Sequence, residues 1–289
     1  MAVKIKSYRL GPLRESRKQS LSDVEGIIRT MLARGLSHRA IVYTLGTVRQ
    51  VLAYGITEGA VSVNVAASVK APRKAHSDAR PVAVWEPIEL EQFRQVADAD
   101  EWAAAWRLTL CGLRRSEVLG LSWGAVDLER GEVQVQAGRV LLDGHRTAVD
   151  DPKSSASRRT VAVGQTRPGT VALLRSLKAR QTADRLALGP GYPETGLVLV
   201  DPLGQPVRPE HYSDRFRVLA RQAGVPVVRL HSVRHTLGLI MHRAGVAPVD
   251  AAAFLGHSLE VHYATYLPSS ERGARSAAAA LGVALAGSV

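Results

Sequence analysis

Apolar residues in the first quarter of the chain recur every three or four positions, the spacing that places side chains on one face of an α-helix. Residues 21–33 and residues 37–54 both show this pattern, and Ser37 is suited to cap the second segment. The inward faces are expected to comprise Val24, Ile27, Ile28, Met31 and Leu32 in the first helix and Ile41, Val42, Leu45, Val48 and Leu52 in the second. The arginines left for the outside of this hairpin, as solvated side chains or as contacts to a nucleic-acid groove, are Arg34, Arg39 and Arg49.

Beyond this hairpin the pattern predicts further helices and then a change of period. Helical spacing recurs over residues 86–97, 101–110, 168–188 and 212–223. From Glu132 to residue 137 the apolar positions alternate instead, and they do so again over residues 160–163, with an Asp143-Gly144 turn in between. The chain is therefore predicted to be mainly α with a small antiparallel β-sheet.

A polar stretch divides the chain into two parts. Residues 71–81 are bracketed by prolines and contain few large apolar side chains, which is typical of a linker between domains. We predict a helical domain over residues 1–72, a linker over residues 73–82 and a larger domain over residues 83–289. The first twenty residues are expected to form an irregular arm, and residues 276–286 a short Ala-rich helix or a frayed tail.

Positive charge is concentrated near the N-terminus. The 289-residue chain has a formal net charge of +12 and a pI of about 10.3. Residues 1–74 contain thirteen lysines and arginines against four acidic residues, a net charge of +9, which leaves +3 for the rest. A basic protein can be merely soluble or bind a membrane surface, but this distribution favours a DNA-gripping module attached to a larger body.

Several kinds of chemistry lack their sequence signals. The single cysteine, Cys111, excludes an intramolecular disulfide and a multi-cysteine metal site, and fits a reduced, cytoplasmic setting. The chain contains neither a secretory leader nor an apolar run of the ~18 residues that a membrane span needs. It also lacks a Walker loop, a Gly-x-Gly-x-x-Gly motif and a His-Glu-x-x-His motif. We therefore expect no ATP, no metal and no other cofactor.

Residues 230–244 have the most distinctive pattern. As a helix, this segment has an apolar side and a cationic side. The apolar side comprises Val233, Leu237, Ile240, Met241 and Ala244, and the cationic side His231, Arg234, His235, Gly238 and His242. Histidine, arginine and glycine together suit the close approach of an anion such as phosphate. By itself the segment is equally consistent with a core helix that has a wet basic side.

Four separated motifs resolve this ambiguity. Arg114 lies in Gly-Leu-Arg-Arg-Ser-Glu, Lys153 in a polar turn, His231 and Arg234 in His-x-x-Arg-His-Thr, and His257 in Leu-Gly-His, nine residues before Tyr266. The order Arg, Lys, His-x-x-Arg, His, Tyr resembles the tyrosine recombinases of the phage-integrase family, roughly from residue 84 to residue 268. The resemblance implies a helical core-type DNA-binding domain followed by a mixed α/β catalytic domain, together forming a C-shaped clamp on DNA.

The resemblance also implies a role for each residue. Two arginines, Arg114 and Arg234, clamp the scissile phosphate, because guanidinium stays charged and offers phosphate a planar fork. Tyr266 is the nucleophile and forms a 3′-phosphotyrosyl link. The supporting residues are His231 as proton acceptor or phosphate donor, His257 as phosphate donor, Lys153 as the acid for the departing 5′ oxygen and Glu117 as the residue that holds Arg114.

Alternatives remain for some of these assignments. Arg115 is the main alternative to Arg114 as the clamping arginine, and Tyr263 is a second tyrosine close to the proposed nucleophile. Taken without the other motifs, Tyr266 is better explained as a buried structural tyrosine. The alternative for Glu117 is that it forms only an ordinary surface ion pair with Arg114, three residues earlier in the helix. We expect no separate arm-type DNA-binding domain, which many family members have, because the residues before the helical hairpin are too few to form one.

The predicted function is that of a site-specific recombinase, most simply a phage or mobile-element integrase. Its expected partners are double-stranded DNA attachment sites, three further copies of itself in a homotetrameric synaptic complex, and accessory DNA-bending or directionality factors, with no membrane. The runner-up is a nicking-closing enzyme like the type IB topoisomerases. A regulator that binds DNA without catalysis is the alternative from another class.

Overall fold

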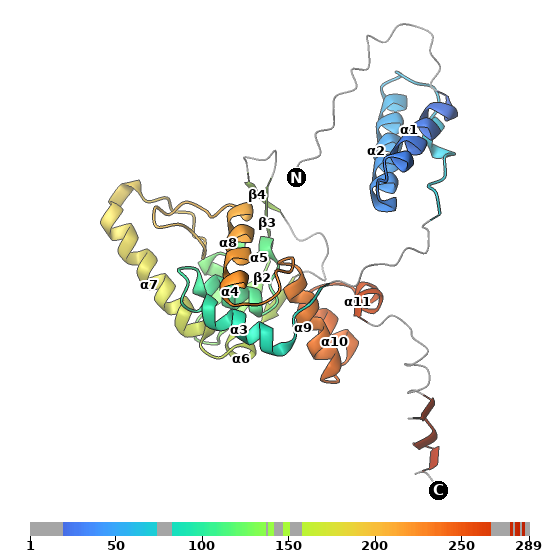
Figure 1. The fold of residues 1–289 in the computed structure, drawn as a ribbon. Helices are drawn as coiled ribbons and strands as arrows, with labels where there is room; N and C mark the ends of the chain where they lie inside the picture. The colour runs from blue at the N-terminus through green and yellow to red at the C-terminus, as the bar shows by residue number, and fades with distance from the viewer. Residues whose placement is uncertain are drawn as a thin grey trace. The chain divides into compact units, whose positions relative to one another are not determined.

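The computed structural model describes residues 20–73, 83–136, 138–141, 147–150, 158–266, 278–279, 281–283 and 285–286. The chain divides into two compact units, residues 1–80 and residues 81–289 (Figure 1). The predicted arm apart from Ser20, and all of the predicted linker except Arg73, lie outside the described residues. In the predicted C-terminal segment, residues 278–279, 281–283 and 285–286 are described, and their backbone is helical.

The N-terminal unit is the predicted helical hairpin. It contains α1 (Leu21–Ala33), α2 (His38–Thr57) and a 3₁₀ turn, η1 (Val65–Ala67). The Ser37 side chain caps α2 by accepting a hydrogen bond of 3.2 Å from the Ala40 N–H, as its residue type predicts. The buried apolar residues of this unit are Val24, Ile28, Ile41, Leu45, Leu52, Ala66 and Val69.

Part of the predicted inward face of this hairpin is wrong. Ile27, Leu32 and Val42 are between 43% and 48% exposed, because two helices cover less of each other than the width of their apolar stripes.

Arg49 does not project from the outside of the hairpin as predicted. Its guanidinium donates to the carbonyls of Ala66 and Val69, at 3.0 and 2.6 Å, and so holds the segment after α2 against the hairpin.

The larger unit is built mainly of helices. They are α3 (Pro87–Ala97), α4 (Ala103–Leu110), α5 (Arg115–Gly120), α6 (Val163–Thr166), α7 (Thr170–Leu188), α8 (Pro209–Gln222), α9 (Ser232–Arg243), α10 (Pro248–Leu255) and α11 (Leu259–Tyr266), with short 3₁₀ turns at η2 (Trp123–Ala125) and η4 (Gly189–Gly191). Helix α8 begins three residues before the predicted start, because Pro209 occupies its first turn. None of the helices that the structure describes is both long and apolar enough to cross a membrane.

Aromatic residues form the centre of this unit. The rings of Trp106 on α4 and Tyr212 on α8 stack with centroids 4.2 Å apart, and the Tyr212 hydroxyl lies 2.8 Å from that of Thr109. Phe93 of α3 and Phe216 of α8 pack nearby, with ring centroids 5.1 Å apart. This core joins α3, α4 and α8 into the body from which the site residues project.

Two small antiparallel sheets accompany the helices, as the alternating pattern predicts. The first has the order β1 (Val126–Asp127), β2 (Glu132–Val135), β5 (Arg159–Val161), and the second pairs β3 (Gly138–Leu141) with β4 (Thr147–Asp150). Val133 lies opposite Val126 on one side and Val161 on the other. The predicted strand over residues 160–163 ends early, because Val163 begins α6. The Asp143-Gly144 turn lies outside the described residues.

Candidate active site

Arg114 is positioned by the turn that follows α4. Gly112 has φ +90°, a left-handed conformation that suits glycine, and Arg114 then caps α5. The Arg114 backbone N–H donates to Glu117 Oε2 at 2.7 Å, and the Arg114 guanidinium contacts Glu117 Oε1 and the carbonyl of Gly256. The predicted contact between Glu117 and Arg114 is therefore present, with Glu117 buried and the Arg114 side chain partly exposed.

Arg159 is a site residue that the motifs in the sequence did not single out. Its Nη1 and Nη2 atoms lie 3.1 and 3.0 Å from the two carboxylate oxygens of Glu117, and its Nε donates to the Phe254 carbonyl at 2.8 Å. Burial alone raises the pKa of Glu117, but the hydrogen bonds and charges of Arg159, and after them those of Arg114, lower it to about 2. Glu117 is therefore an anion that holds two arginines.

The sequence contains one signal for Arg159. Arg159 lies two residues before Val161, so in a strand both side chains point to the same face of the sheet, and Val161 is 1% exposed. A charged residue at an inward position of a strand requires a buried partner.

Arg234 is enclosed by the protein backbone. It lies in α9, is 4% exposed, and donates to the carbonyls of Gly112 and Leu255. Arg234 and Gly238, which the sequence pattern assigned to the cationic side of this helix, are both buried, so that side is not a wet surface at these two positions. A buried guanidinium needs hydrogen-bond acceptors, and the carbonyls of the α4–α5 turn and of the end of α10 supply them.

Two histidines lie beside these arginines. His231 precedes α9 and is partly open to solvent, and His257 follows α10. Partial burial, and after it the charge of Arg234, lowers the pKa of each to about 4. His231 is therefore neutral at pH 7 in the DNA-free protein, as a proton acceptor must be.

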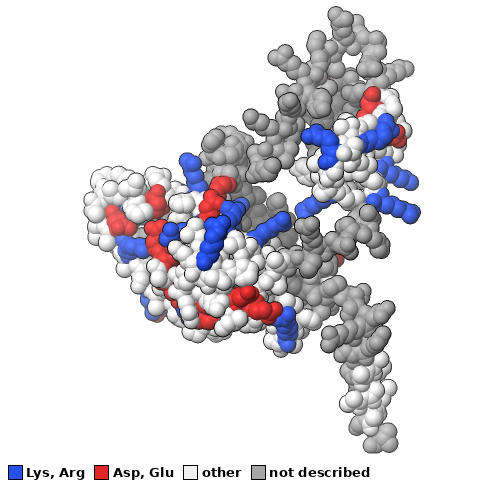
Figure 2. Space-filling view, viewed as in Figure 1, with Lys and Arg blue, Asp and Glu red and all other residues white. Residues whose placement is uncertain are grey.

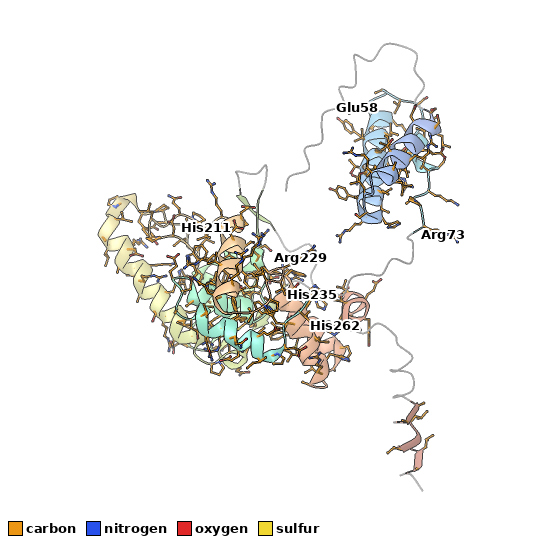
Figure 3. The ribbon with its side chains drawn as sticks, viewed as in Figure 1. Glu58, Arg73, His211, Arg229, His235 and His262 are labelled. Carbon is orange, nitrogen blue, oxygen red and sulfur yellow. The ribbon has the colours of Figure 1, made fainter. Side chains whose placement is uncertain are left out.

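Each of these histidines has a second histidine beside it. The His257 Nε2 atom lies 3.1 Å from Nδ1 of His262, which is 1% exposed. His231 meets the ring of His235 edge to face at 5.1 Å. Figure 3 labels His235 and His262 in the region of α9 to α11.

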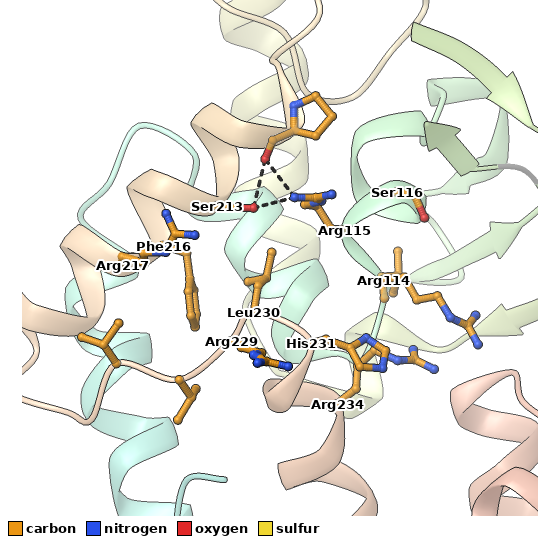
Figure 4. Close-up of a pocket in the computed structure, with 14 residues that line it drawn as sticks. Arg114, Arg115, Ser116, Ser213, Phe216, Arg217, Arg229, Leu230, His231 and Arg234 are labelled. Atoms are coloured by element: carbon orange, nitrogen blue, oxygen red, sulfur yellow. Dashed lines mark hydrogen bonds between the residues drawn. The ribbon is translucent and has the colours of Figure 1, made fainter. Parts of the chain in front are cut away.

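These elements border a cavity of about 720 Å³ (Figure 4). Arg114, His231 and Arg234 all line it. Arg114 contacts the carbonyl of Gly256, and Arg234 contacts the carbonyl of Leu255. These contacts hold the backbone that leads into His257 close to the two arginines. Three of the predicted site residues thus line one cationic cavity, and His257 follows directly on the backbone that holds two of them.

The other two predicted residues are placed only in part or not at all. Lys153 lies outside the described residues. Tyr266 is the last residue of α11, the helix that begins two residues after His257, and Tyr263 of the same helix is 48% exposed. Within the described part of the chain, no three His, Cys, Asp or Glu side chains are grouped to hold a metal ion.

A sequence model described as the phage integrase family matches residues 90–272, which is more than half of the chain and includes every residue of this site. The chain belongs to the phage integrase family. Among curated relatives, it is 27% identical over 182 residues to the tyrosine recombinase XerC-like protein of Caldanaerobacter subterraneus subsp. tengcongensis, covering 59% of this chain and 46% of that protein. It is 23% identical over 231 residues to the ICEBs1 integrase of Bacillus subtilis, covering 78% and 60%. The matched part is thus about half the length of these relatives.

Solved structures share the fold of this phage integrase family member. The integrase of transposon Tn1549, solved in complex with a circular intermediate DNA, superposes with a TM-score of 0.70 at 18% identity and covers 95% of this chain and 89% of that one. A lambda integrase dimer bound to a core site superposes with a TM-score of 0.55 at 14% identity, covering 91% and 83%. The predicted fold class, mainly α with a small antiparallel sheet, is confirmed.

Proposed function

We propose that this protein is a site-specific DNA recombinase that cuts and rejoins DNA through a 3′-phosphotyrosyl intermediate. The observation that carries the proposal is the pair Arg114 and Arg234, held by Glu117 and by backbone carbonyls at the edge of one cavity. Two fixed guanidinium groups match the two non-bridging oxygens of a phosphodiester. Their positions are set before the substrate arrives, so no reorganisation is needed as charge develops.

The chemistry follows from these residues. The phenol oxygen of Tyr266 attacks phosphorus while the bond from phosphorus to the 5′ oxygen breaks. His231, neutral at pH 7, takes the phenol proton, and Lys153 gives a proton to the departing oxygen. Attack by a new 5′ hydroxyl reverses these steps and releases Tyr266. One phosphate ester replaces another, so the reaction needs no ATP, and the arginines supply the charge neutralisation for which other nucleases use a metal.

The partners belong to the same proposal. We expect double-stranded DNA attachment sites, a homotetramer in the synaptic complex, and accessory DNA-bending or directionality factors, all in the bacterial cytoplasm. The similarity to integrases solved on DNA supports the DNA partner. The names of the relatives, recombinases and integrases, favour recombination over a topoisomerase-like activity.

Covalent trapping tests this function and separates it from a purely DNA-binding regulator. A nicked suicide duplex, incubated with the protein in excess EDTA, is expected to yield a protein–DNA adduct that peptide mapping assigns to Tyr266. Tyr266→Phe removes one oxygen and keeps the ring, so it should bind DNA without forming the adduct. The matched control is Tyr263→Phe, three residues earlier in α11, which should still form it. An adduct at Tyr263, no adduct at all, or one that requires magnesium contradicts the proposal.

A further inference from the structure

The cavity at the site is larger than one phosphate group requires. Its volume of about 720 Å³ lies within the range of ~300–1,000 Å³ that encloses whole drug-sized ligands. Its described lining contains no carboxylate and includes five arginines, at positions 114, 115, 217, 229 and 234. Arg114 and Arg234 lie on one side of this basic surface, and Arg115 lies on another (Figure 4).

Two consecutive arginines take opposite directions from the start of α5. Arg114 turns to Glu117 and the Gly256 carbonyl. Arg115 turns to α8, where its Nη1 lies 2.8 Å from the Ser213 hydroxyl and 3.4 Å from the Pro209 carbonyl (Figure 4). The second arginine of the Arg-Arg pair is thus placed on the wall of the cavity that lies away from Arg234.

Arg229 also lines the cavity, on the turn that leads to His231 (Figure 4). Its carbonyl accepts a hydrogen bond of 2.7 Å from the Ser232 N–H, which closes the turn before α9 and brings both residue 229 and residue 231 to the cavity. The Arg229 side chain is exposed. Arg217 also lines the cavity, but its charge is already engaged by an ion pair with Asp214.

We propose that Arg115 and Arg229 form a second phosphate subsite, which binds the phosphodiester next to the one that is cleaved. The inference rests on the proposed function and deepens it, because it assigns two phosphates of the cleaved strand to one cavity. Consecutive phosphates of a strand are separated by a single sugar, so a basic cavity large enough for a whole ligand can meet two of them. A strand held at two phosphates has a fixed direction as well as a fixed position, which aligns its 5′ oxygen for departure.

Ethylation interference tests the subsite on whichever DNA sequence the protein selects. The probe is a duplex selected by the wild-type protein from a random-sequence pool and ethylated at single phosphates, which removes their charge. The scissile phosphate is mapped separately from the covalent adduct on the unmodified duplex. Arg229→Gln and Arg115→Gln are each expected to bind about tenfold more weakly at about 0.1 M salt. Both should lose interference at the same phosphate, adjacent to the scissile one.

Arg221→Gln provides the matched control, because Arg221 is also exposed and lies on α8 but does not line the cavity. It should keep interference at that phosphate. The proposal is overturned if the two variants lose different phosphates, if they lose none, or if the shared phosphate is not adjacent to the scissile one. If the wild type forms no adduct, the proposed function fails, and the interference pattern still decides whether Arg115 and Arg229 share a phosphate.

Discussion

Arg159 and Glu117 form a buried ion pair, with Arg159 Nη2 at 3.0 Å from Glu117 Oε2 and both side chains 7% exposed. Glu117 also accepts from the backbone N–H of Arg114, while Arg159 donates to the end of α10. The pair therefore connects β5, α5 and α10. Through it, the strand that follows the Lys153 segment is fixed to the arginine that we assign to the phosphate clamp.

The first prediction concerns removal of one partner of this pair. Arg159→Met leaves Glu117 buried without one of its two arginines, and should reduce the free energy of unfolding by about 3–5 kcal/mol. Urea unfolding measures the change. Arg175→Met, which removes an exposed ion pair with Glu129, is the matched control and should cost at most ~1 kcal/mol. Equal effects of the two substitutions contradict the conclusion that the buried pair stabilises the fold.

A second prediction uses a glycine beside this pair. Gly256 has φ +65°, and a Cβ added there lies 2.6 Å from Arg159 Nη1. Gly256→Ala should displace Arg159 and reduce adduct formation, as well as adding backbone strain. Gly245→Ala provides the control, because Gly245 has φ +76° and no atom within 4 Å of the added Cβ. It should cost only the backbone strain of about 1–2 kcal/mol and leave adduct formation intact. Comparable losses of adduct in both variants contradict the prediction.

The contrast between the motif residues and Arg159 shows what local sequence encodes. Arg114, His231, Arg234 and His257 stand in short motifs whose spacing is visible in the chain, so the site was predictable from them. Arg159 binds Glu117 across 42 residues and Phe254 across 95, and no local pattern carries such a pairing. Periodicity predicted the helices but not which apolar residues stay exposed, because that depends on which helix packs against which.

The third prediction distinguishes charge from geometry at Arg234. Arg234→Lys keeps a positive charge but cannot donate to the Gly112 and Leu255 carbonyls while also offering phosphate a planar fork. DNA binding should persist, and the rate of adduct formation should fall by about 10²–10³-fold. Arg243→Lys is the control on the same helix, since Arg243 is exposed and pairs with Glu86, and its rate should stay unchanged. A normal rate for Arg234→Lys contradicts the clamp.

The fourth prediction concerns pH. In the folded, DNA-free protein the pKa values of His231 and His257 are about 4, below the ordinary 6.5 that they regain on unfolding. Between these pH values the unfolded chain binds more protons, so stability is complete above about pH 6.5 and falls as the pH drops towards 4. Thermal unfolding of His257→Gln should show a smaller drop in melting temperature between pH 7.5 and pH 5. His211→Gln, on α8 and outside the cavity lining, should retain the wild-type drop.

The last prediction separates the contributions of the N-terminal charges. Figure 2 shows basic side chains projecting from the described part of the N-terminal unit. Residues 1–19, however, contain six basic residues and one acidic residue, and so carry +5 of the +9 that residues 1–74 contribute. The logarithm of the DNA-binding constant should fall with the logarithm of the salt concentration by about 0.9 for each phosphate neutralised.

Deletion of residues 1–19 should therefore flatten this salt dependence while leaving the hairpin of α1 and α2 intact, because its core begins at Val24. Deletion of residues 1–74 should flatten it further. A variant with the six basic residues of the first segment changed to glutamine keeps the chain length and controls for it, and should behave like the shorter deletion. If both deletions keep the wild-type slope, the DNA backbone is gripped by the larger unit, and the cavity arginines then account for most of the electrostatic affinity.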